Sequence, residues 1–213
     1  KFINKNFNNY SLEDLFLISE LSNSQRLNTS AYFTPKEIGY SVVKGLPSFK
    51  GKKEIRILEP SVGVGNFLPL LFSKYAEIKS VIIDVCDIDN NSLKILTCFL
   101  KLINPPKNFK VNLIDSDFLL KQFDINYDLV VGNPPFKKVT NNKSLLKSYK
   151  TNIFNENTNN LFAFFIEKAL EIGRNIAFII PKSLINSPEF NKTRTLLLKH
   201  NLVKIIDYGE KAF

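Results

Sequence analysis

The chain has 213 residues, of which 44% are hydrophobic and 23% charged, a composition typical of one globular domain with a well-buried core. No apolar run reaches the length of about 18 residues that a membrane span needs, and the amino end lacks a signal-peptide core, so we expect a cytoplasmic protein. The formal net charge of +9 favours a polyanionic partner.

The amino-terminal part of the chain predicts helices. Apolar residues recur at helical spacing within residues 11–28, namely Leu12, Leu15, Phe16, Ile18 and Leu21. A second helix is expected to begin with Thr34 as its N-cap and Pro35 in its first turn. Glu37 completes a capping box, and this helix is expected to run to about Val43. Residues 1–50 therefore form a predicted helical amino-terminal extension.

From residue 51 onward, short apolar segments alternate with amphipathic ones. Strands are predicted over residues 55–58, 81–85, 110–114, 127–131, 176–180 and 203–207. Helices are predicted over residues 66–76, 91–103, 160–172 and 188–200, and the polar, Asn-rich stretch 138–158 is expected to be a mobile loop. This alternation predicts an α/β domain over residues 51–213, with a mostly parallel, doubly wound sheet and helices on both faces.

Residues 129–136 carry the most informative motif of the chain. An apolar run ends at Gly132, and Asn133, Pro134, Pro135 and Phe136 follow it. The glycine and the two prolines stop the strand, so the loop lies at the carboxyl end of a strand, where ligands bind in open α/β sheets. An ordinary strand-ending turn is the alternative interpretation, because Asn and Pro are common turn residues.

The loop has the chemistry for moving a group onto a planar amino nitrogen, whose lone pair is delocalised. The side-chain carbonyl of Asn133 and the main-chain carbonyl of Pro134 can each accept one hydrogen of that nitrogen, which draws it toward tetrahedral geometry. Pro135 stiffens the loop, since proline fixes φ near about −65° and has no N–H. Phe136 is suited to stack on the flat target.

A loop with two glycines follows the first predicted strand, beginning at Glu59 and Pro60. Gly63 and Gly65, one residue apart, let the backbone approach a ligand closely. The loop is not a dinucleotide fingerprint, because the third glycine is missing, and not a P-loop, because no Gly-Lys-Ser/Thr follows. Glu59 would repel a pyrophosphate, but it suits a ligand with an ammonium group, such as the methionine part of S-adenosyl-L-methionine.

Acidic residues also close the next two predicted strands. Asp87 ends the second strand and is suited to hold two ribose hydroxyls, with Ile88 against an adenine face. Asp117 follows the third strand and is suited to accept from an adenine amino group, with Phe118 stacking. Each acid taken singly is most often a cap or turn residue, the role we expect for Asp89. Acids closing three successive strands outline a nucleoside-shaped pocket.

Basic residues follow the Asn-Pro-Pro-Phe motif directly. Residues 137–150 contain no acid and five lysines: Lys137, Lys138, Lys143, Lys147 and Lys150. We predict that these lysines contact phosphates, and a solvated loop is the alternative. No metal site is predicted, because Cys86 and Cys98 form no CxxC pair and the single histidine is His200.

The ordered set of motifs resembles the N6-adenine-specific DNA methyltransferases of restriction–modification systems, in the class whose cofactor motif precedes its catalytic motif and whose target recognition region comes last. Residues 32–35 resemble the amino-terminal motif, in which Thr34 contacts the methionine carboxylate. Residues 59–67 resemble the cofactor motif, and residues 133–136 match the catalytic NPP(Y/F) motif. Residues 160–170 and 177–181 resemble later segments, so the resemblance covers nearly the whole chain.

This resemblance implies a Rossmann-like class I S-adenosylmethionine-dependent methyltransferase fold, with residues 1–50 packing on the cofactor site. It implies methylation of the exocyclic amino group of adenine in double-stranded DNA, with S-adenosylmethionine as cofactor and a target recognition domain, specificity subunit or nuclease subunit as partner. The chain departs from the family pattern at Val62, where Cys or Ala is usual, and at Phe136, where Tyr is commoner. We expect the chain to end before the last hairpin of the catalytic sheet, without a target recognition domain.

Two alternative functions are consistent with the same residues. Methyltransferases that act on a protein glutamine or an RNA guanine use the same Asn-Pro-Pro chemistry on another planar amino group. The second alternative is not an enzyme but a cofactor-binding or DNA-binding subunit of a larger restriction–modification assembly. Residues 32–35 and 160–162 favour adenine in DNA, and the intact Asn133–Phe136 loop argues against a pure scaffold.

Overall fold

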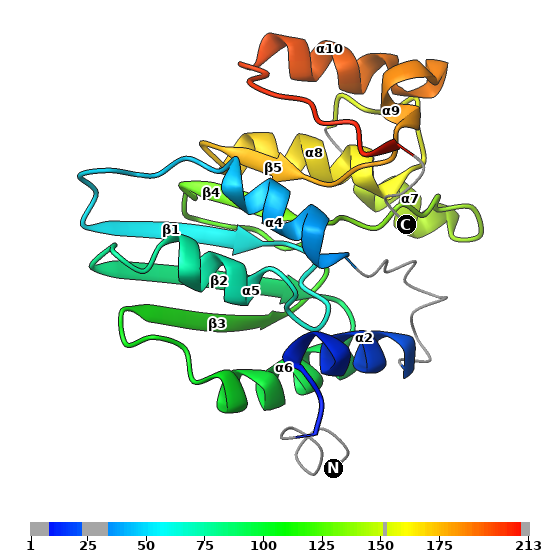
Figure 1. Ribbon diagram of the computed structural model, residues 1–213. Coiled ribbons are helices and arrows are strands. Elements are labelled where there is room, and N and C mark those ends of the chain that lie inside the picture. The colour runs from blue at the N-terminus through cyan, green and yellow to red at the C-terminus, as the bar shows by residue number, and fades with distance from the viewer. Residues whose placement is uncertain (1–8, 23–33, 151–152, 210–213) are drawn as a thin grey trace.

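The computed structural model describes residues 9–22, 34–150 and 153–209, and a parallel sheet lies at its centre (Figure 1). The strands are β1 (Glu54–Glu59), β2 (Ser80–Asp87), β3 (Phe109–Asp115), β4 (Leu129–Gly132) and β5 (Ile176–Phe178). Their order is β3-β2-β1-β4-β5, and every neighbouring pair is parallel. The predicted parallel α/β sheet is therefore confirmed.

The order of the strands creates a switch point between β1 and β4. The chain runs outward from β1 to β2 and β3, then returns to place β4 on the other side of β1. Leu58 of β1 pairs in register with Val130 of β4, so the loops that follow these two strands begin side by side. Ligands bind at such points in doubly wound sheets.

Helices cover both faces of the sheet (Figure 1), as the sequence predicts. The helices on one face are α4 (Lys36–Lys44), α5 (Leu68–Lys74) and α6 (Asn90–Ile103). The opposite face is covered by α8 (Leu161–Ile172). Near the amino terminus, α2 (Leu12–Ser22) packs on α6 through an edge-to-face contact between Phe16 and Phe99. Among the described residues, no helix is long and apolar enough to cross a membrane.

Alternating side chains along the central strands divide the core into two layers. Ile57, Ile83 and Leu129 are fully buried on the face covered by α4, α5 and α6. Leu58 and Val130 are fully buried on the face covered by α8. Strands with both faces covered are nearly continuous in apolar residues, which explains why their sequence pattern is a short apolar run.

The segment after β4 is more regular than the sequence predicts. Residues 138–158, expected to be a mobile loop, contain the helix α7 (Lys143–Tyr149). The side chain of Asn142 caps this helix by accepting from the Leu145 N–H at 3.0 Å, and Tyr149 is buried. A short polar helix of this kind depends on its tertiary contacts, which periodicity does not reveal.

The predicted strand over residues 203–207 is wrong. Residues 201–208 have no regular structure, and they pair with no strand in the described part of the chain. The side chain of Val203 is 85% exposed, so this apolar run lacks the partner strand that would bury it. The helix predicted over residues 188–200 comprises the 3-10 turn Pro188–Phe190 and α10 (Asn191–Lys199), and the short helix α9 (Ser183–Asn186) precedes them.

One expectation about the amino-terminal helices needs correction. The helix α2 spans Leu12–Ser22, as predicted, and residues 23–28 of the predicted segment lie outside the described residues. The N-cap of α4 is Pro35 rather than Thr34, and no side chain caps its N–H groups. The Thr34 hydroxyl instead accepts a hydrogen bond from the Asn133 side chain, so a residue predicted to start a helix contacts the β4 loop.

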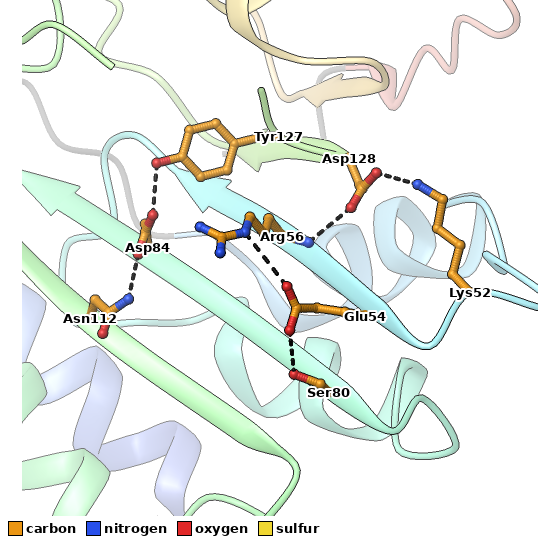
Figure 2. A network of polar contacts seen from close by, with 8 residues as sticks. All are labelled: Lys52, Glu54, Arg56, Ser80, Asp84, Asn112, Tyr127 and Asp128. Carbon is orange, nitrogen blue, oxygen red and sulfur yellow. Dashed lines mark hydrogen bonds and ion pairs between the residues drawn. The ribbon is translucent and has the colours of Figure 1, made fainter. Parts of the chain in front are cut away.

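A polar network lies on the α8 face of the sheet, from the amino-terminal ends of β1 and β2 to the middle of β2 and β3 (Figure 2). At its buried end, the Tyr127 hydroxyl and the Asn112 side-chain amide each donate to Asp84, both at 2.7 Å. At its exposed end, Lys52 pairs with Asp128, and the Arg56 N–H donates to the same carboxylate at 3.0 Å. The network is away from the carboxyl ends of the strands, so we assign it a structural role.

Replacing Tyr127 with phenylalanine is expected to lower the free energy of unfolding by about 1.5–3 kcal/mol, the usual contribution of a hydrogen bond to a charged group. The ring stays in place, and the buried Asp84 carboxylate loses one of its two donors. Urea denaturation of the two proteins measures the difference. A variant as stable as the unmodified chain would show that Asp84 does not depend on this hydroxyl.

Candidate active site

The loops that follow β1 and β4 meet at the switch point of the sheet. The Ser61 hydroxyl donates to the main-chain carbonyl of Asn133 at 3.1 Å, which ties the two loops together. The side-chain amide of Asn133 donates to the Thr34 Oγ1 atom at 3.2 Å, so the segment before α4 also joins this junction. Three segments far apart in the sequence therefore fix the position of Asn133.

A cavity of about 400 Å³ opens beside this junction, a size typical of small-molecule sites. The predicted cofactor residues that line it are Thr34, Glu59, Pro60, Gly63, Asp87, Ile88, Asp117 and Phe118. Gly65 does not line the cavity. Its φ is 96°, and a Cβ atom there would lie 2.6 Å from the Leu96 side chain, so this glycine serves packing beneath the loop.

Glu59 supplies a buried carboxylate at the end of β1. Its side chain is 2% exposed, and none of the residues in the described ranges forms a hydrogen bond with its Oε2 atom. Burial raises the pKa of Glu59 well above its ordinary value, and the nearby negative charge of Asp87 raises it further. A buried carboxylate oxygen on a ligand cavity is costly unless it is paired, so this atom fits a cationic or hydrogen-donating ligand group.

Asp87, at the end of β2, is held by the backbone of the glycine loop. The Gly63 N–H donates to its Oδ2 atom at 2.8 Å and the Asp89 N–H to its Oδ1 atom at 2.9 Å. Burial raises the pKa of Asp87 to about 6, although these backbone donors oppose the shift. Both oxygens keep further lone pairs for a ligand.

The neighbouring acid, Asp89, has the capping role that the sequence predicts. It is the N-cap of α6 and accepts from the Asn91 N–H at 3.0 Å and the Ser92 hydroxyl at 2.9 Å. This prediction is confirmed.

Asp117 and its neighbour form the far wall of the cavity. The Leu119 N–H donates to the Asp117 Oδ1 atom at 2.9 Å, and the Tyr149 hydroxyl donates to Oδ2. Phe118 is 2% exposed and packs against Phe165 of α8 with 4.8 Å between ring centroids. By contrast, the side chain of Ile88 is 61% exposed at the opening of the cavity.

The predicted catalytic loop is only partly in contact with the cavity. Asn133 and Pro135 line it, whereas Pro134 is buried. Phe136 packs edge-on against Phe162 of α8, with 6.4 Å between ring centroids. The rigid prolines and the aromatic contact hold the loop in one conformation, so Asn133 reaches the cavity from a fixed backbone.

The five lysines after this loop divide into two groups. Lys137 and Lys138 line the cavity, and Lys138 also forms an ion pair of 2.9 Å with Glu189. Lys143 and Lys147 lie on the exposed side of α7, and the Lys150 ammonium donates to the Glu156 carbonyl at 2.6 Å. The lysines therefore border the opening of the cavity and the helix beside it.

Two residues that the sequence analysis missed line the cavity. Glu20 on α2 is 5% exposed, and its Oε1 atom accepts from the Val64 N–H at 3.4 Å. An acid on the apolar face of an amphipathic helix, one turn after Phe16, was the signal that could have identified it. Tyr149 lies in the stretch expected to be a mobile loop, where no sequence pattern indicated a contact.

Replacing Gly63 with alanine is expected to weaken cofactor binding by about tenfold. It should also lower the free energy of unfolding by more than about 1–2 kcal/mol, the cost of a left-handed backbone for a residue with a Cβ atom. Its φ is 54°, and a Cβ atom would lie 2.8 Å from the Glu20 Oε1 atom. Gly51 is a matched control, because its φ is 84° but no atom lies within 4 Å of its Cβ position. Thermal unfolding and calorimetric titration with S-adenosylhomocysteine compare the two variants; equal effects would exclude a role of the Glu20 contact.

Comparison with known proteins places these features in a family. The family model described as Eco57I restriction-modification methylase matches residues 62–213. The type II methyltransferase M.AccI of Acinetobacter calcoaceticus is 28% identical over 91% of this chain and 36% of its own length. M.CvrRI of Paramecium bursaria Chlorella virus XZ-6E, also a type II methyltransferase, is 30% identical over 83% of this chain and 42% of its own length. The chain thus spans less than half the length of these curated relatives.

Solved structures agree on the fold. A Listeria monocytogenes protein assigned to the class I S-adenosylmethionine-dependent methyltransferases aligns with a TM-score of 0.68 and 20% identity, over 90% of this chain and 61% of its own. The methyltransferase subunit of a type I restriction-modification system from Streptococcus thermophilus aligns with a TM-score of 0.60 and 17% identity, over 79% of this chain and 38% of its own. The predicted Rossmann-like methyltransferase fold is confirmed. With a match over most of its length, the chain belongs to the Eco57I restriction-modification methylase family.

Proposed function

We propose that this chain transfers a methyl group from S-adenosylmethionine to the exocyclic amino group of adenine in DNA, as part of a restriction–modification system. The observation that carries the proposal is the junction at the switch point, where the Asn133 loop meets a cavity lined by Glu59 and Asp87. One side of this arrangement suits a cationic nucleoside ligand, and the other suits a planar amino group.

The residues present fit the cofactor. Glu59, with its buried Oε2 atom, would accept from the ammonium group, and Asp87 would accept from the ribose hydroxyls. Asp117 would accept from the adenine amino group, and Thr34 would contact the methionine carboxylate. When bound, S-adenosylmethionine supplies an electrophilic methyl group on its sulfonium.

The catalytic loop would prepare the target nitrogen for attack. A flipped adenine would donate its amino hydrogens to the Asn133 side-chain carbonyl and the Pro134 main-chain carbonyl, with Phe136 against the flat base. Accepting both hydrogens localises the lone pair and aims it, so positioning supplies much of the rate. The proton leaves after transfer, and none of the described residues is assigned as its base.

DNA binding would rely on the basic residues that border the cavity. The net charge of +9 and the five lysines of residues 137–150 supply phosphate contacts that release counterions. We propose that residues 51–213 form the catalytic domain and residues 1–50 an extension on the cofactor site. A target recognition domain or a separate specificity subunit would select the sequence, since the curated relatives are more than twice as long as the aligned part.

A substrate panel tests the proposal. The complete natural protein is incubated with S-adenosylmethionine labelled on the methyl group and with duplex DNA, RNA or a glutamine-bearing release factor. We expect label in DNA only. Label in RNA or in the release factor would support the alternative methyltransferase, and cofactor binding without transfer to any substrate would support a non-enzymatic subunit.

A further inference from the structure

Tyr149 connects the helix after the catalytic loop to the far wall of the cofactor cavity. It is the last residue of α7, its side chain is 8% exposed, and its hydroxyl donates to the Asp117 Oδ2 atom. Its ring lies against Phe164 of α8, with 6.2 Å between ring centroids. Both Tyr149 and Asp117 line the cavity, so this hydrogen bond is part of the wall that a ligand would meet.

Two donors hold the Asp117 carboxylate from opposite oxygens. The Leu119 N–H donates to Oδ1 at 2.9 Å, and the Tyr149 hydroxyl occupies one side of Oδ2. A carboxylate held at both oxygens cannot rotate freely, so its remaining lone pairs point in fixed directions. Burial raises the pKa of Tyr149 above its ordinary value, and the hydroxyl therefore remains a protonated donor at neutral pH.

We propose that Tyr149 is a positioning residue for base recognition, which holds Asp117 so that this carboxylate accepts from the exocyclic amino group of the cofactor's adenine. The inference rests on the proposed function and adds a residue to it. In this proposal α7 contributes to both binding surfaces. Leu145 and Tyr149 line the cofactor pocket, and Lys143 and Lys147 lie on the exposed side of the same helix.

The positioning role predicts a loss of discrimination between two ligands that differ only at the base. S-adenosylhomocysteine carries the 6-amino group, whereas S-inosylhomocysteine carries a 6-oxo group that a carboxylate repels. Removal of the Tyr149 hydroxyl frees the Asp117 side chain to rotate, which weakens the amino-group contact and relieves the repulsion. A residue that only supports the fold would change the affinity for both ligands by the same factor.

Calorimetric titration of both ligands into the full chain tests this inference with the variants Tyr149→Phe, Asp117→Asn and Tyr40→Phe. Tyr40 on α4 is 60% exposed and is the matched control. We expect Tyr149→Phe to weaken S-adenosylhomocysteine binding about tenfold, an effect of the size of one hydrogen bond to a charged group. Because the repulsion is relieved, binding of the inosine analogue should stay unchanged or become slightly stronger. We expect Asp117→Asn to reduce the preference at least as much, and Tyr40→Phe to keep it.

Equal weakening of both ligands by Tyr149→Phe, or an unchanged preference, would overturn the positioning role. Thermal unfolding of each variant confirms that the compared proteins are folded at the temperature of the titration. If the unmodified chain binds neither ligand, the proposed function itself fails and the inference falls with it. If the unmodified chain binds both ligands equally, the cofactor site stands but Asp117 does not read the base, which also overturns the inference.

Discussion

Replacing Asn133 with alanine is expected to slow methyl transfer to DNA by about 10²–10³-fold, the usual effect of removing one group that acts on the reacting centre. The substitution deletes the side-chain carbonyl that would accept from the target amino group, and the amide that donates to Thr34 at 3.2 Å. Glu59, Asp87 and Asp117 are unchanged, so the affinity for S-adenosylmethionine should stay within about threefold, less than one hydrogen bond contributes. Single-turnover transfer from labelled cofactor by the complete natural protein measures the rate.

Two control variants separate catalysis from support of the loop. Thr34→Val removes the acceptor for the Asn133 amide but leaves the side-chain carbonyl, so it should slow transfer less than Asn133→Ala when both are measured at saturating S-adenosylmethionine, because Thr34 is also proposed to contact the cofactor. Asn133→Asp keeps an acceptor oxygen at this position and should also retain more activity. A rate with Asn133→Ala equal to that of the unmodified protein would contradict the catalytic assignment, and an equal loss of cofactor affinity would assign Asn133 to binding instead.

Replacing Asp87 with asparagine is expected to weaken S-adenosylhomocysteine binding by about 10–100-fold, because a charged acceptor of two ribose hydroxyls becomes neutral. The effect should depend on pH. Burial raises the pKa of Asp87 from 3.8 to about 6, so the accepting carboxylate forms only as the pH rises through about 6. The affinity of the unmodified chain should therefore increase between pH 5 and pH 7, and that of Asp87→Asn should change much less.

The raised pKa of Asp87 affects the stability of the protein without ligand in the opposite direction: as the pH rises, the affinity for the ligand increases but the free energy of unfolding decreases. Between pH 3.8 and about 6 the folded chain keeps the Asp87 proton that the unfolded chain has lost, so the contribution of this group to stability falls as the pH rises. Glu59, whose pKa is also raised by burial and by Asp87, acts in the same direction. Above pH 6 a ligand that donates to these carboxylates offsets this loss.

Asp89→Asn is the matched control for Asp87→Asn. Asp89 caps α6, and asparagine caps helices about as well as aspartate, so its substitution should leave the affinity at pH 7 nearly unchanged. Because the negative charge of Asp89 helps to raise the pKa of Asp87, the rise in affinity with pH should persist in this variant but begin at a lower pH. Calorimetric titrations at pH 5, 6 and 7 compare the three proteins. The assignment of Asp87 to the ribose would be contradicted by identical pH dependence in the unmodified chain and in Asp87→Asn.

Local periodicity was sufficient to predict much of the fold. The apolar runs that form β1, β2 and β3 are bounded by turn residues, and α6 ends at Ile103, the predicted position, with Asn104 as its left-handed C-cap before two prolines. Periodicity failed where tertiary contacts decide the structure. The helix α7 is stabilised by the burial of Tyr149, and the run over residues 203–207 lacks a pairing partner among the described strands.

In the candidate site, too, the residues set by the strand pattern could be predicted, whereas the residues set by tertiary contacts could not. Glu59, Asp87 and Asp117 could be predicted to lie together because the carboxyl ends of parallel strands share one edge of the sheet. Glu20 and Tyr149 could not, because Glu20 contacts the loop 44 residues further on and Tyr149 contacts Asp117 from 32 residues away. Gly65 was predicted to approach the ligand, but the Leu96 side chain takes the space beside it.

The most direct test of the proposed function is the chemical identity of the methylated product. The complete natural protein is incubated with duplex DNA and methyl-labelled S-adenosylmethionine, and the DNA is digested to nucleosides that are separated and identified by mass spectrometry. The proposed function predicts that the label is recovered as N6-methyl-2′-deoxyadenosine. Label recovered on cytosine, or DNA that remains unlabelled while RNA or a protein is methylated, would contradict the proposed function.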